Sequence, residues 1–290
     1  MKTNISNILA VICICAMTSC SNEVDFGEQY KKTLYIVNSN DLLYTAEHFF
    51  ETEIDAIVIS VYCASSEPVT SDLKARLMVE PIALDTLNAI NTLVNPSYIE
   101  KVMLPAANYS FAGESEVTIK AGTQYGTLSI PFRFTGLDPD IAYTLPVVLV
   151  SNSAGYDINP ALQAIVYEVK MMNRYSGNFA GTSQESAAVI RGVQPVLKAL
   201  SAHTVRMAIH NLSDDWQYIN TNFMLLTIAE DGSVTITPWA NAHVTDLGEN
   251  YYDADLQRFE LNYQFTNAGG STFTVSEIIT NINAPINKME

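Results

Sequence analysis

The 290-residue chain carries 15 basic and 31 acidic side chains, which gives a formal net charge of -16. Nucleic acid and anionic lipid head groups are repelled by such a surface, so neither is an expected partner. Only 16% of the residues are charged and 10% are aromatic, a balance that is common in secreted β proteins that meet neutral polar ligands.

Residues 1–19 have the pattern of an export signal. One basic residue, Lys2, precedes an apolar run over 8–17, and small residues follow. The run is too short to stay in the bilayer as a membrane span. The segment Met17-Thr18-Ser19-Cys20 resembles a bacterial lipobox, so we expect cleavage after Ser19 and acylation of Cys20.

Residues 20–29 form a short, polar and acidic stretch with Glu23, Asp25 and Glu28. We interpret it as a tether between the lipid and the first folded domain. Acidic residues directly behind the lipid resemble the signal that sends lipoproteins to the outer face of the outer membrane in Bacteroidetes. We therefore expect a lipid-anchored outer-membrane protein that faces the cell exterior.

Cleavage and acylation would leave one thiol in the mature chain. Cys13 and Cys15 are lost with the signal and Cys20 carries lipid, so only Cys63 remains. An intramolecular disulfide and a cysteine metal cluster are then excluded. Cys63 follows an apolar run, and we interpret it as a small buried hydrophobic residue.

The first half is rich in short β-branched and aromatic runs between turn signals, which predict strands at the spacing of a sandwich. The predicted strands cover 34–37, 56–62, 117–119, 128–134, 143–150 and 164–169. Pro131 and Pro146 place their strands at edges or bulges, because proline cannot donate to a ladder. Between the strands, Leu84, Leu87 and Ile90 lie three apart, which predicts a short helix over 83–91.

The second half is again β-rich. Asp231-Gly232 separates two apolar runs and predicts a tight hairpin, and 268–271 marks another turn. Residues 259–266 alternate apolar and polar side chains, so one face of that strand belongs to a core and the other to solvent.

We therefore expect an all-β protein with two antiparallel β domains. Residues 30–172 form an N-terminal immunoglobulin-like sandwich with a short helix. Residues 173–290 form a C-terminal domain that is either a sandwich or a flattened barrel, and the sequence does not separate these two.

Two groups of motifs carry a family resemblance. They are 229–236 with 252–253 and 259–263 in the second half, and 137–139 with 143–147 in the first. Together they resemble Bacteroidetes two-domain surface lipoproteins of polysaccharide-utilisation loci, whose domains have no assigned function. The resemblance implies a glycan-binding accessory like the starch-binding lipoproteins, beside an outer-membrane importer or a glycoside hydrolase. It implies no ligand residues.

Enzyme signatures are missing from the sequence. There is no Gly-x-Ser-x-Gly, phosphate-binding glycine loop, His-Glu-x-x-His or calcium loop. The four histidines are dispersed without metal-ligand spacing, so no cofactor and no metal site is expected. Acidic residues are open to two other interpretations, a glycosidase pair or a structural calcium site, beside the simpler one of solvated loop acids. The candidates for the glycosidase pair are Asp214, Asp215, Asp246, Glu249, Asp253 and Asp255, and the calcium interpretation concerns the last four of these.

Four aromatic residues of the second half are the candidate ligand site. Sugar recognition uses flat rings against C–H faces and polar groups at the edge. Trp216 and Tyr218 lie in a polar, loop-like stretch, and Tyr251 follows a turn. Trp239 shares the period of Thr235 and Thr237 and should be exposed if Pro238 preserves the register. The alternative is that these rings plug the core.

We expect a non-catalytic protein that binds glycan through a shallow platform, which is built from some of Trp216, Tyr218, Trp239 and Tyr251. The rival hypothesis is a structural or adhesive surface protein, fimbrial or protein-binding, that pairs by strand addition. An exposed aromatic platform favours the first, and a long unpaired edge strand favours the second.

Overall fold

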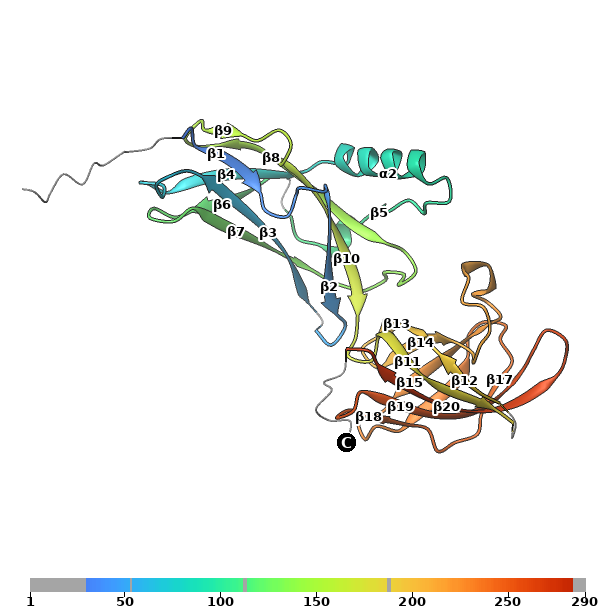
Figure 1. Ribbon diagram of the computed structural model, residues 1–290. Helices are drawn as coiled ribbons and strands as arrows, with labels where there is room; N and C mark the ends of the chain where they lie inside the picture. The colour runs from blue at the N-terminus through green and yellow to red at the C-terminus, as the bar shows by residue number, and fades with distance from the viewer. Residues whose placement is uncertain (1–29, 53, 112–113, 187–188, 284–290) are drawn as a thin grey trace, which may run out of the picture.

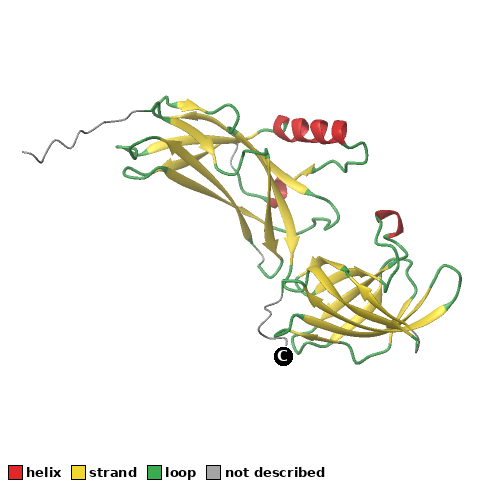
Figure 2. Cartoon of the chain, viewed as in Figure 1, coloured by secondary structure: helices red, strands yellow, loops and turns green. Residues whose placement is uncertain are grey.

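The computed structural model describes residues 30–283 except 53, 112–113 and 187–188. The predicted signal peptide, the predicted acylation site Cys20 and the predicted tether lie outside the described residues. The described chain forms two β units that meet between β10 and β11 (Figure 1), and strands dominate both (Figure 2). Among the described residues, no helix has the length and apolar character needed to cross a membrane.

Two sheets make up the N-terminal unit. One has the strand order β7-β3-β1-β9, and the other has the order β2-β10-β8-β4-β6 with β5 beside β8. The pairs β1/β9, β2/β10 and β5/β8 are parallel, so this sandwich is mixed and not purely antiparallel. Its strands are β1 (Thr33–Ile36), β2 (Leu43–Phe49), β3 (Asp55–Ala64), β4 (Leu73–Val79), β5 (Val102–Met103), β6 (Glu114–Ile119), β7 (Tyr125–Phe132), β8 (Tyr143–Asn152), β9 (Asp157–Ile158) and β10 (Ala164–Met172).

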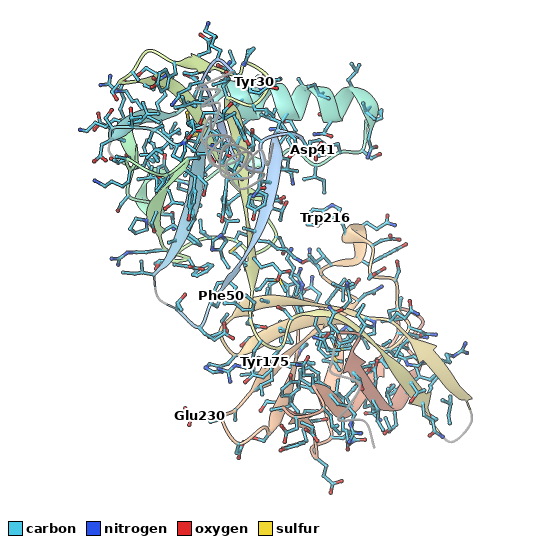
Figure 3. All side chains as sticks on the ribbon, turned by 60° about the vertical axis from the view of Figure 1, so that its left-hand side comes forward. Tyr30, Asp41, Phe50, Tyr175, Trp216 and Glu230 are labelled. Atoms are coloured by element: carbon cyan, nitrogen blue, oxygen red, sulfur yellow. The ribbon has the colours of Figure 1, made fainter. Side chains whose placement is uncertain are left out.

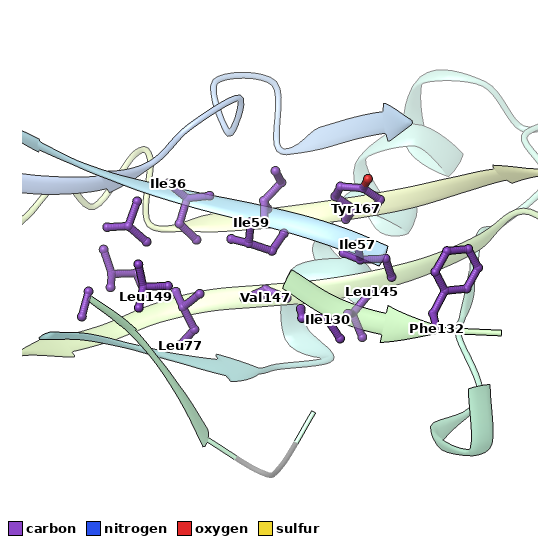
Figure 4. Close-up of a cluster of buried hydrophobic side chains, with 14 of the residues drawn as sticks. Ile36, Ile57, Ile59, Leu77, Ile130, Phe132, Leu145, Val147, Leu149 and Tyr167 are labelled. Atoms are coloured by element: carbon purple, nitrogen blue, oxygen red, sulfur yellow. The ribbon is translucent and has the colours of Figure 1, made fainter. Parts of the chain in front are cut away.

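The core of this unit lies between the two sheets, where side chains of alternate strand positions meet (Figure 4). Ile57, Ile59 and Val61 of β3 are buried, as the period of two requires. Cys63 continues the same series and is fully buried, which confirms its predicted character.

The predicted helix is α2 (Ile82–Val94), which covers the six-stranded sheet beside β8 and β10; a short 3-10 turn, η1 (Ala106–Asn108), follows it. Leu84 and Leu87 are buried, but Ile90 is exposed, contrary to the expected apolar face. A spacing of three falls 60° short of a helical turn at each step, so Ile90 is rotated away from the sheet. Half-buried Asn91 lies on the covered face in its place.

The two prolines behave differently. Pro131 lies in β7, an edge strand, as predicted. Pro146 lies in β8, which is central, so the expectation of an edge or bulge there is wrong. The Pro146 carbonyl accepts from the Glu80 N–H just beyond the last β4–β8 pair, Val79 with Val147. The N–H and C=O of one residue point to the same neighbouring strand, so the bond that this proline cannot make lies beyond the last β4–β8 pair, where the Glu80 carbonyl accepts from the Ala83 N–H (3.3 Å) instead.

The C-terminal unit is one ten-stranded sheet of order β16-β15-β14-β13-β11-β20-β19-β17, with β12 beside β11 and β18 beside β19. It curls until β16 contacts β17, so the unit is barrel-like. Its strands are β11 (Gly177–Glu185), β12 (Val189–Val193), β13 (Val196–Ser201), β14 (Thr204–Ala208), β15 (Phe223–Ile228), β16 (Val234–Pro238), β17 (Val244–Asp246), β18 (Tyr251–Asp253), β19 (Arg258–Thr266) and β20 (Thr272–Asn281).

Two predicted local features of the second half are confirmed. In β19, buried residues alternate with partly exposed ones along the whole strand. Strands β15 and β16 form the antiparallel hairpin around Asp231-Gly232. Gly232 has a φ of 87°, a backbone conformation that residues other than glycine rarely adopt.

The two units make contact on both sides of the β10–β11 junction. The Asn173 side chain donates to the carbonyls of Ser201 (2.6 Å) and Thr204 (3.1 Å), and the Arg174 N–H donates to Glu51 (2.8 Å). β10 also contacts β13. The wall of the barrel made by β13 and β14 therefore lies against the N-terminal unit.

Candidate functional site

Trp216 and Tyr218 lie in the loop between β14 and β15, on the 3-10 turn η2 (Trp216–Tyr218). Their exposed fractions are 69% and 42%. The loop projects from the barrel, with Trp216 at its tip (Figure 3). The Asn222 side chain donates to the Ser213 carbonyl across the base of the loop (3.0 Å), so the loop has a defined shape that presents both rings to solvent.

Trp239 follows β16, and its N–H donates to the Phe223 carbonyl (3.2 Å), which continues the ladder beyond Pro238. The register is therefore intact, but the ring is partly buried and not openly exposed as expected. The reason is the Arg206 guanidinium, which lies 4.8 Å from the ring centroid and covers one face. The indole Nε1 is buried without an acceptor among the described residues.

Three of the four predicted residues lie at one end of the barrel. The Asn241 N–H donates to the Asn220 carbonyl (2.8 Å), which places the loop after Trp239 beside the η2 loop. Tyr251 is 48% exposed but packs against Gly232, at the opposite end of β16. The length of the strand separates it from Trp239 by about 20 Å. Tyr251 therefore lies apart from the other three rings, and a platform built from some of the four would use Trp216, Tyr218 and Trp239.

Sequence reasoning missed an ion-pair cluster beside Trp239. Arg206 of β14 binds Asp140 with two bonds, Nη1 to Oδ2 at 2.8 Å and Nη2 to Oδ1 at 2.6 Å, and Lys198 of β13 binds Oδ1 at 2.7 Å. These bonds hold the pKa of Asp140 at about 2. The guanidinium also lies over the Phe223 ring, 5.5 Å from its centroid. Asp140 and Arg206 are 66 residues apart, and no local pattern connects them.

A pocket of about 420 Å³ lies between the two units, next to this cluster. Asp140 and Lys198 line it together with side chains of β10 and the first residues of β11. It is a mixed surface: Glu168 and Lys170 supply charge, and Met172 supplies an apolar wall. The pocket shows that polar groups of both domains converge on one place.

Two paired family models match the chain. One, described as an N-terminal domain, covers residues 30–155, and the other, described as the C-terminal domain, covers residues 163–280. The chain belongs to this two-domain Bacteroides family. No protein with a curated description matches the sequence.

Solved structures show the same two-domain fold over nearly the whole chain. A Bacteroides ovatus protein of unknown function has a TM-score of 0.65 at 16% identity, covering 86% of this chain and 94% of its own. A multidomain protein from the same organism gives 0.61 at 16% identity, with 87% and 93% covered. A Bacteroides thetaiotaomicron protein described as an auxiliary nutrient binding protein gives 0.56 at 14% identity, with 84% and 92% covered.

Two of the acidic residues considered as a catalytic pair or a calcium site, Asp246 and Asp253, have structural partners in this family member. Asp246 accepts from the Ile236 N–H (2.8 Å), the Gly248 N–H (2.7 Å) and the Asn250 side chain (2.6 Å). Asp253 accepts from two N–H groups of the following turn. These carboxylates stabilise turns, and no group of three or more potential ligands that could hold a metal ion occurs among the described residues.

A polar cluster lies inside the barrel of this two-domain protein. The Tyr263 hydroxyl donates to Glu277 (2.6 Å) and accepts from the His210 N–H (2.9 Å), and Ser183 Oγ lies 2.7 Å from His210 Nδ1. His210 Nε2 lies 3.6 Å from Glu185. A serine, a histidine and an acid in series resemble a nucleophile and its base, but Ser183 is fully buried and a glycan chain has no access to it.

Burial controls the ionisation of this cluster. It raises the pKa of Glu277 to about 7, because a carboxylate loses solvation inside the barrel. It raises the pKa of Tyr263 further above its ordinary range and lowers that of His210. Glu277 Oε1 has no hydrogen-bond donor in the described structure. No local sequence pattern indicates this cluster, since its members come from four separate segments.

Proposed function

We propose that this chain is a non-catalytic, lipid-anchored protein of the outer cell surface that binds glycan through Trp216 and Tyr218. The observation that carries the proposal is the 69% exposure of Trp216 at the tip of a hydrogen-bonded loop. A large ring kept in water on a shaped loop suits stacking against the C–H face of a sugar. The description of a fold relative as an auxiliary nutrient binding protein supports the same class.

Surface anchoring suits weak individual sites. Many copies tethered through Cys20 would hold one polysaccharide chain together, and avidity would compensate for a low affinity of each copy. An outer-membrane importer or a glycoside hydrolase is the partner we propose, because a captured glycan has to be cut or imported. Protease treatment of intact cells tests the location: complete protection of the chain contradicts exposure on the cell surface.

The double replacement Trp216→Ala and Tyr218→Ala is expected to weaken glycan binding at least tenfold. Removing an aromatic anchor commonly costs more than about 1 kcal/mol, and tenfold corresponds to about 1.4 kcal/mol. Affinity electrophoresis of the mature chain from Ser21 onward measures it, in gels that contain starch, xylan, mannan or galactan.

Tyr125→Ala is the matched control, because Tyr125 is a 62% exposed ring on β7 of the other domain. It should migrate like the parent chain in every gel. If no neutral glycan retards the parent chain, or if the double variant is retarded equally, the proposed site is wrong.

A protein-binding accessory remains the second candidate, because α2 exposes apolar side chains. Leu93 and Val94 are 86% and 80% exposed, and the helix has a single acidic residue in its first turn and no basic residue in its last. Contiguous exposed apolar surface marks interaction sites. This candidate is favoured by two results together: the chain binds a protein partner equally well after Trp216 and Tyr218 are replaced, and no glycan gel retards the parent chain.

A further inference from the structure

Two cations lie side by side on the outer wall of the barrel. Lys198 and Arg206 are direct partners across the β13–β14 ladder. Like charges directly opposite each other destabilise a sheet unless an anion lies between them. In a chain with a net charge of -16, a pair of adjacent cations is therefore a preformed site for an anionic group.

Asp140 of the N-terminal unit occupies this site. Its carboxylate makes all three bonds to the two cations, at 2.6 to 2.8 Å. The loop between β7 and β8 delivers it: the Asp140 N–H donates to Asp138 (2.8 Å), which fixes the turn. The anion is thus supplied from the other domain and not from the barrel itself.

Aromatic rings and unused donors surround the same spot. The Arg206 guanidinium lies over the rings of Trp239 and Phe223, at 4.8 and 5.5 Å from their centroids. Arg206 Nε and Trp239 Nε1 are both buried, and neither has an acceptor in the described structure. Buried N–H groups without acceptors cost free energy, and ligand oxygens would satisfy them.

We propose that Lys198, Arg206 and Trp239 form a second sugar subsite, selective for a carboxylate-bearing sugar and covered in this structure by Asp140. The inference rests on the proposed glycan-binding function and names a substrate class for it. A uronate carboxylate takes the place of the Asp140 carboxylate, while the sugar ring lies at the edge of Trp239, one face of which the Arg206 guanidinium covers. Sugar oxygens accept from the two unused N–H groups.

Binding requires the two units to separate at this contact, because the Arg206 side chain is only 4% exposed. The exchange replaces one carboxylate by another, so neither cation is left unpaired in a buried place. The adjacent pocket of about 420 Å³, which Asp140 and Lys198 line, gives the ligand a route to the cations. Asp140 acts as a tethered competitor, and it lowers the apparent affinity for the free ligand.

Calorimetry with trigalacturonate and with its fully methyl-esterified form tests the proposal on the mature chain from Ser21 onward. Asp140→Asn removes the competing carboxylate, and trigalacturonate should then bind at least tenfold tighter than it does to the parent chain. The methyl ester has the same rings without the charge, and its affinity should not change. Arg206→Gln added to Asp140→Asn should cancel the gain.

Glu116→Gln is the matched control, since it removes one negative charge from the same domain at an exposed pair with Lys74. It should leave the affinity for trigalacturonate unchanged, which excludes a general effect of charge. Thermal unfolding checks that each variant is folded.

The proposal is overturned if folded Asp140→Asn shows no gain, or if the methyl ester gains equally, because domain release alone then explains the result. Either outcome leaves the proposed neutral-glycan site at Trp216 and Tyr218 untouched. If that site is wrong instead, the gain in trigalacturonate affinity of Asp140→Asn can still be measured.

Discussion

Replacing Glu277 by glutamine is expected to raise the free energy of unfolding of the barrel by about 3 kcal/mol at pH 8 and to change it little at pH 4. Burial raises the pKa of Glu277 in the folded chain to about 7, against an ordinary value of 4.5. Each unit of difference in pKa corresponds to about 1.4 kcal/mol.

The sign follows from which state holds the proton more tightly. The folded state does, so this group contributes its full stability below pH 4.5 and loses it as the pH rises to 7. Glutamine is uncharged at every pH and still accepts from the Tyr263 hydroxyl. The parent chain and the variant share the other charged groups near the cluster, which are His210, Glu185 and Arg191. The difference between their two profiles of stability against pH therefore isolates Glu277.

Urea unfolding followed by tryptophan fluorescence at pH 4, 6 and 8 measures this difference. Both tryptophans of the chain, Trp216 and Trp239, lie in the barrel, so the signal reports the correct domain. Glu260→Gln is the control, because this acid lies partly exposed on the neighbouring strand. This variant should have the same free energy of unfolding as the parent chain at each of the three pH values. Parallel pH profiles of the parent chain and Glu277→Gln would contradict the prediction, because they would mean that the pKa of Glu277 is the same in the folded and the unfolded chain.

Features encoded by neighbouring residues were predictable from the sequence. The alternation along β19 follows the period of two of a strand, and the Asp231-Gly232 hairpin is encoded by two adjacent turn residues. Buried Cys63 follows from the same period in β3. The helix was also predictable, but its exposed Ile90 was not, because a spacing of three residues only approximates a helical turn.

Features that depend on distant pairing were not predictable. The exposure of Trp239 depends on Arg206, and the place of Arg206 depends on Asp140 in the other domain. Pro146 is tolerated in a central strand because β4 ends beside it. The sequence around the proline does not show where β4 ends. For the same reason the sequence does not show that the length of β16 separates Tyr251 from Trp239.

Gly181→Ala is expected to destabilise the barrel by about 3 kcal/mol or more, or to prevent its closure. Gly181 lies in the middle of β11, paired with Ile279 of β20 on one side and Val193 of β12 on the other. A Cβ at this position would overlap with the Ile278 carbonyl, which is backbone and cannot rotate away. β20 would have to move outward and break its ladder with β11, and overpacking of this kind commonly costs 1–3 kcal/mol or more.

Gly192→Ala provides the matched control for this prediction. Gly192 is paired with Thr182, the residue after Gly181, but a Cβ there meets no atom within 4 Å. Both variants add one methyl group to the same pair of strands, so chain entropy and strand propensity change alike. Urea unfolding should therefore leave Gly192→Ala within about 0.5 kcal/mol of the parent chain. Equal stability of the two variants would mean that β11 and β20 do not approach as closely as the barrel requires.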